Sequence, residues 1–132
     1  MNEYSFERLE VYMLARDFRK KIYKLTKDLP EHEKYNLINQ MLRAALSLTN
    51  NIAEGHGRYH YQENIQFLRQ ARGSLEELLD DINTCIDEKY TDEAKLNSLK
   101  EEGYELLKKI NGYVKYLRIR KEEELPINKL TN

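Results

Sequence analysis

The stretch from Asn51 to Arg58 places an amide, a carboxylate and a guanidinium within eight positions, beside apolar residues. Gly55 alone is enough to end a helix, because a residue without Cβ enters the left-handed conformation at no steric cost. The polar groups need another explanation, since an unpaired polar group beside a core costs about 1–3 kcal/mol. The stretch therefore predicts a polar network between helices, in which Glu54 pairs with a partly buried Arg58 and Asn51 has a structural role.

Gly73 and Ser74 form a second unusual pair, because both are poor helix formers within a helical pattern. A close contact with another helix would offset their cost, so we expect the second helix to cross here and Glu77 to reach toward Arg43 or Asn51. A catalytic serine is the sharper alternative, but no histidine shares its helix face. The residues of this structural polar motif are Arg43, Asn51, Glu54, Gly55, Arg58, Gly73, Ser74 and Glu77.

The sequence carries no nucleophile elbow, no phosphate-binding glycine loop and no paired-cysteine metal motif. A di-iron bundle needs inward Glu-x-x-His pairs on two helices, whereas His32, His56 and His60 fall at helix beginnings and in a joint. The acids from Glu77 to Asp81 are better explained as a solvated face than as a cation site. We therefore expect no enzyme, no cofactor, no metal and no small-molecule substrate.

Four segments with a helical spacing of apolar residues position these groups. They run from about Phe6 to Lys27, Pro30 to Gly55, Tyr61 to Glu88 and Asp92 to Arg120. The last has steps of three and four, typical of left-handed helix packing, through Leu96, Leu99, Gly103, Leu106, Ile110, Tyr113 and Leu117. Gly103 is expected where a neighbouring helix comes close. Four amphipathic helices with short joints predict an all-α protein, an antiparallel up-down-up-down four-helix bundle.

One domain is predicted over residues 1–121, because a chain of 132 residues suffices for one core. After Arg120 the chain turns polar, and Pro126 is expected to stop the helix and leave residues 122–132 as a flexible tail. No signal-peptide core is recognisable, and no apolar run approaches the ~20 residues that span a bilayer. The lone Cys85 suits a reducing compartment, so we expect a cytoplasmic protein without a membrane partner.

The antiparallel topology also predicts where basic side chains gather on the surface. In an antiparallel bundle the joint after the second helix lies beside the end of the fourth, where residues 108–121 contain no acid. The net charge of −1 means that nucleic-acid contact depends on such local patches. Tyr59, Tyr61, Tyr113 and Tyr116 lie among these cations, and their rings can stack on bases. The nucleic-acid-binding residues expected at this end are Arg58, Arg69, Arg72, Lys115, Arg118, Arg120 and Lys121.

A purely structural explanation of these cations stays open. Lysines in the last turns of a helix complement its dipole, and Glu122 to Glu124 would shield part of the patch. The opposite end is expected to be acidic, from Glu76 to Glu93. Lysines of the first segment would offset that acidity in part, namely Lys20, Lys21, Lys24 and Lys27.

Four short motifs occur once each between Pro30 and Glu77: Pro30-x-x-Glu33-x-Tyr35-x-Leu37, Gln40-x-x-Arg43-Ala44-Ala45-x-Ser47, Asn51-Ile52-Ala53-Glu54-Gly55-x-Gly57-Arg58 and Ala71-x-Gly73-Ser74-x-x-Glu77. Together they resemble the 23S rRNA intervening sequence protein family over about residues 6–120. The chain departs from that pattern at Leu42, where the family often has a second arginine. The resemblance implies a compact four-helix bundle that assembles into a homopentameric ring.

The resemblance leaves two functions open. Related ring-forming bundle proteins that assist diversity-generating reverse transcription bind nucleic acid, which implies contact with RNA or DNA through the basic end. The alternative is a protein-binding or scaffolding ring without nucleic-acid contact, with Tyr12 and Tyr23 exposed at subunit contacts. In both cases the partners of the chain include copies of itself.

Overall fold

Helices make up the described part of the chain, which comprises residues 5–131 of the computed structural model, with side chains described for residues 5–123. The α-helices are α1 (Glu10–Thr26), α2 (Leu37–His56), α3 (Tyr61–Asp87) and α4 (Glu93–Thr131). Two short 3-10 helices, η1 (Phe6–Arg8) and η2 (Glu31–Glu33), precede α1 and α2. No strand occurs within residues 5–131, so the prediction of an all-α protein is confirmed.

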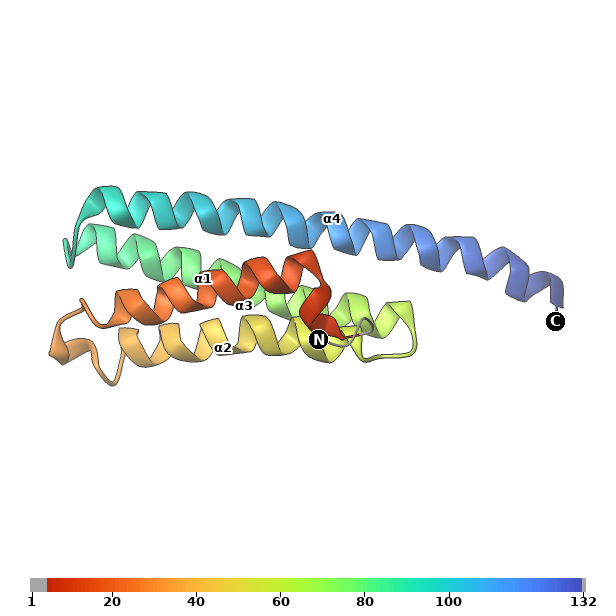
Figure 1. Cartoon of the computed structure of the whole chain (residues 1–132), viewed down its shortest axis with the longest axis horizontal. Coiled ribbons are helices and arrows are strands. Elements are labelled where there is room, and N and C mark those ends of the chain that lie inside the picture. Colours follow the sequence, from red (N-terminus) through yellow and green to blue (C-terminus); the bar gives the residue numbers. More distant parts are fainter. Residues whose placement is uncertain (1–4, 132) are drawn as a thin grey trace.

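The four α-helices form a bundle in which consecutive helices run antiparallel (Figure 1). Helix α1 packs against α2 and α4, and α3 packs against the same two helices. Helices α1 and α3 therefore stand on opposite sides of the bundle. The joint between α2 and α3 lies at the same end as the start of α1 (Figure 1), as the up-down-up-down topology predicts.

One hydrophobic core joins all four helices, because the apolar stripe of each helix is buried. In α4 the buried residues of the predicted stripe are Leu96, Leu99, Gly103, Leu106, Ile110 and Leu117. Tyr113 is only partly buried, and Val114 takes its place in the core. An α-helix has 3.6 residues per turn, so a strict seven-residue repeat drifts away from the inward face along a long helix.

Gly103 marks a close approach between helices. A Cβ at this position would lie 2.7 Å from Cδ2 of Leu79 in α3 and 3.2 Å from Cζ of Phe18 in α1. Both neighbours belong to the core, and Phe18 is fully buried. The prediction that a neighbouring helix comes close at Gly103 is confirmed.

Gly55 has a different role from the one predicted. It is helical and buried, α2 continues through His56, and no glycine among the described residues has a positive φ. The prediction that Gly55 ends the helix through the left-handed conformation is therefore wrong. A Cβ here would lie 2.7 Å from Oδ1 of Asn64 and 2.8 Å from Cβ of Phe67. Gly55 thus allows α3 to approach α2 closely just before the joint.

Two helix boundaries also differ from the prediction. Helix α2 begins at Leu37 instead of Pro30, because Asn36 has φ −122° and ψ −98°, outside the helical region, and separates η2 from α2. Helix α4 continues past Pro126 to Thr131, so the prediction that proline ends the helix is wrong. A proline removes one hydrogen bond, but the preceding Glu122 to Glu124 are good helix formers.

Residues 122–131 therefore extend α4 beyond the ends of the other helices (Figure 1). The predicted tail is helical up to Thr131, and Asn132 lies outside the described residues. The flexibility of this segment stays a prediction.

Candidate nucleic-acid interface

A polar network links α2 to α3, as the sequence predicts, but its centre is Ser47. The amide nitrogen Nδ2 of Asn51 donates to the main-chain oxygen of Ser47 at 2.9 Å and to its Oγ at 3.0 Å. The hydroxyl of Ser74 donates to the same Oγ at 3.0 Å. The hydrogen bond between Ser74 and Ser47 connects the two helices, so this ladder helps to fix their register.

Gly73 does not make the close crossing that the sequence predicts. A Cβ at Gly73 would have no neighbour within 4 Å, whereas Ser74 contacts α2. Successive helical residues are about 100° apart around the axis, so only one of the pair can face α2. Gly73 therefore lies exposed on the outer face of α3 without any contact that offsets its low helix propensity.

Arg43 and Glu77 lie beside the same network. They line a shallow groove of about 360 Å³ between α2 and α3, together with Asn39, Gln40, Ala44, Ser47 and Ser74. Among the described side chains no ion pair joins Glu77 to Arg43, and Asn51 is bonded to Ser47 instead. The expected reach of Glu77 to either residue is therefore absent from the structure.

Glu54 and Arg58 form a surface pair outside this network. Their closest charged atoms are 3.9 Å apart, with side chains that are 61% and 41% exposed. The guanidinium of Arg58 lies 4.8 Å from the ring centroid of Phe67. The predicted pairing of Glu54 with Arg58 is therefore present, but the prediction that the cation is partly buried is wrong. An exposed pair at this spacing contributes only about 0.3–0.5 kcal/mol.

Contacts between α3 and α4 hold two of the predicted cations at the basic end. Nη1 of Arg72 donates to Oδ1 of Asn111 at 2.9 Å, and Nζ of Lys121 donates to Oε1 of Gln62 at 2.6 Å. These acceptors are neutral amides, so neither hydrogen bond neutralises its cation. Nε of Arg72 also lies 3.9 Å from Oε1 of Glu76 in the same helix, so the charge of Arg72 is partly compensated, whereas Lys121 has no such partner among the described side chains.

Arg69, Lys115 and Arg118 are exposed and form no ion pair with any side chain within residues 5–123. Lys115 and Arg118 follow Asn111 by four and seven residues, so they share the face of α4 that meets Arg72. Arg58 instead lies over Phe67 on the α2 side of α3. The structure therefore brings together six of the seven predicted cations, which we call the basic end: Arg69, Arg72, Lys115, Arg118, Arg120 and Lys121.

A hydrophobic groove lies near the basic end, where α4 passes the start of α1. It has a volume of about 270 Å³ and is lined by Leu9, Glu10, Val11, Lys109, Tyr113 and Tyr116. Nζ of Lys109 lies 3.0 Å from Oε1 of Glu10, which connects the two helices at this groove. Sequence reasoning named both tyrosines but missed Leu9 and Val11, because only the fold places the start of α1 beside them.

The tyrosines near the basic end differ in accessibility. The rings of Tyr113 and Tyr116 have centroids 6.3 Å apart and planes inclined by 32°. Burial raises the pKa of Tyr113, while Tyr116 is 55% exposed. A hydrogen bond with Tyr61 raises the pKa of Arg120. Tyr59 is almost fully exposed at the α2–α3 joint.

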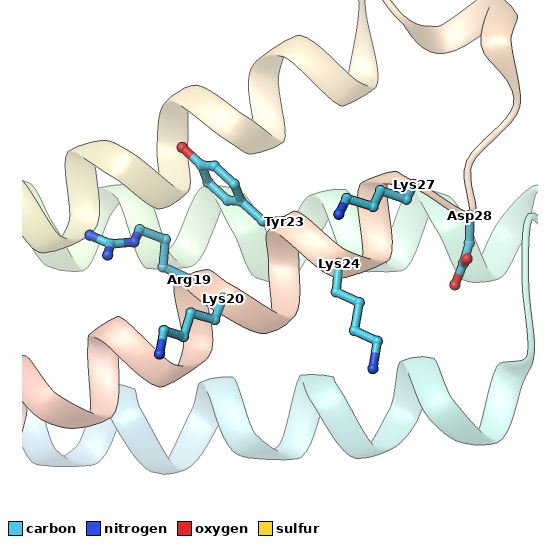
Figure 2. Close-up of a pocket in the computed structure, with 6 residues that line it drawn as sticks. All are labelled: Arg19, Lys20, Tyr23, Lys24, Lys27 and Asp28. Carbon is cyan, nitrogen blue, oxygen red and sulfur yellow. The ribbon is translucent and has the colours of Figure 1, made fainter.

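A second basic surface covers the outer side of α1 (Figure 2). Its cations, which we call the α1 basic face, are Arg19, Lys20, Lys24 and Lys27. Together with Tyr23 and Asp28 they line an open hollow of about 610 Å³. The lysines of this face form no ion pair with the described side chains, and Arg19 donates to Oγ1 of Thr49 at 2.8 Å.

The sequence interpretation treated these lysines only as compensation for an acidic end. The structure shows such compensation elsewhere, in the pairs Lys21–Glu102 at 2.8 Å and Lys95–Asp28 at 3.1 Å. The signal that was missed is the spacing of Lys20, Lys24 and Lys27, which puts them on one helix face. Of the two aromatics expected at subunit contacts, Tyr23 is exposed, whereas Tyr12 is partly buried against the core.

Two ionisable groups of α3 lie in the interior. Asp81 is only 7% exposed and its Oδ2 has no hydrogen-bond partner. Burial, and then the charges of Glu77 and Asp80, raise the pKa of Asp81 to about 6. Cys85 is fully buried, and burial followed by the charges of Asp81 and Glu33 raises the pKa of its thiol to about 11.

No group of three or more metal-ligating side chains is present in the part of the chain that the structure describes. Within the same residues, no helix is long and apolar enough to pass through a membrane. The notable features of the described surface are its charged side chains, its exposed aromatic rings and its shallow grooves.

The fold and these surfaces define a charged four-helix bundle protein. The model of the 23S rRNA-intervening sequence protein family matches residues 7–112, so the chain belongs to this family. A crystal structure of a protein with unknown function from the S23 ribosomal protein family, from Bacteroides thetaiotaomicron, has the same fold. It is 23% identical, with a TM-score of 0.74 over 80% of this chain and 98% of that chain. No curated protein matches the chain.

Proposed function

We propose that this protein is a cytoplasmic, non-enzymatic nucleic-acid-associated protein that contacts RNA through the basic end. The observation that carries the proposal is the exposed group of Arg69, Lys115 and Arg118, none of which forms an ion pair with a described side chain. Clustered Lys and Arg side chains that are not internally neutralised are the usual source of phosphate contacts. The family name refers to 23S rRNA, which makes RNA the first polymer to test.

The size of the basic end sets the expected strength of binding. If these three exposed cations neutralise about three phosphates of a single strand, affinity falls about 20-fold between 50 and 200 mM salt. The net charge of the whole chain is −1, so distant charges add little attraction. Binding is therefore expected to be weak and strongly salt-dependent.

The double substitution Lys115→Glu with Arg118→Glu is expected to weaken RNA binding at least about tenfold at 50 mM salt, because it reverses two phosphate-contacting charges. Fluorescence anisotropy with a labelled RNA measures the change. The matched control is Lys34→Glu with Lys100→Glu, which alters net charge equally but lies toward the other end of the bundle, since Lys34 precedes α2 and Lys100 is in the third turn of α4. Equal losses in both variants would refute the proposed location, and no RNA binding at 50 mM salt would refute the function.

A second function, a self-assembling scaffold without nucleic-acid contact, is favoured by the charges of α1 and α3. The α1 basic face lies opposite a row of exposed acids of α3, which includes Glu77, Asp80 and Asp87, and Glu88 follows directly after the helix. Two complementary faces on opposite sides of one subunit join copies head to tail, and such contacts close into a ring or grow into a filament. We propose a homopentameric ring as the closed form.

Reversal of the α1 charges by Lys20→Glu with Lys24→Glu is expected to dissociate this assembly, and sedimentation at low salt measures the change. Mixing that variant with a Glu77→Lys and Asp80→Lys variant is expected to restore association as alternating chains or even-numbered rings, because both contacts between unlike variants are then complementary and contacts between like variants are repulsive. A wild-type protein that is monomeric at micromolar concentration and low salt excludes the scaffold. If the variant with reversed α1 charges assembles as the wild type does, this interface is excluded.

A further inference from the structure

The groove lined by Leu9, Glu10, Val11, Lys109, Tyr113 and Tyr116 combines an aromatic wall with an apolar floor. Val11 is buried and Leu9 partly buried, so both belong to the margin of the core. The volume of about 270 Å³ is just below the range of small-molecule sites, which begins at about 300 Å³. It suits one planar ring better than a whole ligand.

The two tyrosines have complementary roles in this wall. Tyr113 is partly buried and interacts through its hydroxyl with the side chain of Asn64, so its ring is held in place. Tyr116 is 55% exposed and presents its ring toward solvent. The centroid distance of 6.3 Å shows that the rings are adjacent, while the inclination of 32° keeps them from stacking closely on each other. The exposed ring of Tyr116 is available to a planar partner.

Charges next to the tyrosines match a polyanionic strand. Arg120 is hydrogen-bonded to Tyr61 and interacts electrostatically with Tyr116 and with Glu123, and Lys115 precedes Tyr116 in the same helix. Lys109 is paired with Glu10, so it contributes to the shape of the groove more than to its net charge. A ligand with an aromatic ring in the groove and phosphates beside it would meet both kinds of group. Nucleotides have this combination.

We infer that the groove takes an unpaired nucleobase, so that the basic end selects single-stranded over double-stranded nucleic acid. The inference rests on the proposed nucleic-acid association and adds the class of substrate. A duplex buries the faces of its bases against each other, whereas a single strand can place one against an aromatic side chain. Tyr116 stacks on the base, Tyr113 supports Tyr116, and Lys115 and Arg120 contact the neighbouring phosphates.

The test compares labelled single strands and duplexes of about 12 nucleotides, a length within the range of single-strand sites. With the full chain at 50 mM salt, we expect the single strand to bind about tenfold more tightly. Tyr116→Ala is expected to remove that preference and leave duplex binding unchanged, while Tyr116→Phe retains it because the ring remains. Tyr104→Ala, which removes another exposed tyrosine of α4, is the matched control. A 2-aminopurine base in the strand is expected to lose fluorescence on wild-type protein but not on Tyr116→Ala.

The outcomes separate this inference from the function on which it rests. Equal affinity for both probes, together with a loss on Lys115→Glu and Arg118→Glu, would overturn the base site while the nucleic-acid association stands. Unchanged single-strand binding by Tyr116→Ala would also overturn it. If neither probe binds at 50 mM salt, the association and the base site both fail. Thermal melts of each variant exclude unfolding as the cause.

Discussion

Gly55→Ala is expected to destabilise the protein by about 2 kcal/mol, although alanine is the better helix former by about 1 kcal/mol. The new Cβ would lie 2.7 Å from Oδ1 of Asn64 and 2.8 Å from Cβ of Phe67, distances that require α2 and α3 to move apart. Asn64 is itself buried, so it has little room to yield. Thermal unfolding is expected to show a melting temperature lower by about 8 °C for a domain of this size.

Gly73→Ala makes the same chemical change where a Cβ would meet nothing within 4 Å. There the gain in helix propensity stands alone, so stability is expected to rise by about 0.5–1 kcal/mol. Both substitutions add one methyl group to a helix, so the difference between their effects on stability reports the close contact at Gly55. Equal effects of the two substitutions, in either direction, would show that the close contact at Gly55 does not limit the bundle.

Stability is expected to decrease as pH rises from about 4 to about 7, because of Asp81. Its pKa in the folded protein is about 6, above the ordinary value of 3.8, so the folded state retains the proton to a higher pH than the unfolded state does. The stabilisation is complete below the ordinary pKa and is lost as pH passes through the folded one. A shift of this size corresponds to at most about 3 kcal/mol, and partial solvent screening makes about 2 kcal/mol a fair expectation.

Asp81→Asn removes the buried charge, so at pH 7.5 it is expected to raise the free energy of unfolding by about 2 kcal/mol and to have little effect near pH 4. Urea unfolding across this pH range measures both values. Asp17→Asn is the matched control, because Asp17 is exposed in α1 and is not among the charges that act on Asp81. A pH profile that is the same for wild type and Asp81→Asn would show that Asp81 is already hydrated or paired.

The sequence predicted the parts of the fold that depend on local periodicity. The apolar stripes placed the core, and Gly103 was correctly expected at a close contact, because both follow from helix geometry. The ends of helices were less predictable, since Asn36 separates η2 from α2 and α4 continues past Pro126. Those boundaries depend on single backbone angles and on small differences in helix propensity, which a pattern of apolar residues does not encode.

The candidate site was predictable only as far as topology determines it. Antiparallel helices necessarily bring the cations of α4 near the start of α3, and the structure confirms that proximity for Lys121 and Gln62. Which cations are neutralised depends on side-chain distances, so the pairing of Lys109 with Glu10 could not be foreseen. The α1 basic face was missed for a related reason. Whether its lysines have acidic partners can be seen only when the positions of the neighbouring helices are known.

The burial of Cys85 has a chemical consequence for the whole molecule. Reaction with an oxidant requires that the sulfur is accessible and is present as a thiolate. In the folded bundle Cys85 is fully buried, and its raised pKa favours the protonated thiol. The only cysteine of the chain therefore becomes reactive only when the bundle opens around it. A disulfide between the Cys85 residues of two copies would therefore show that both bundles had opened before the bond formed.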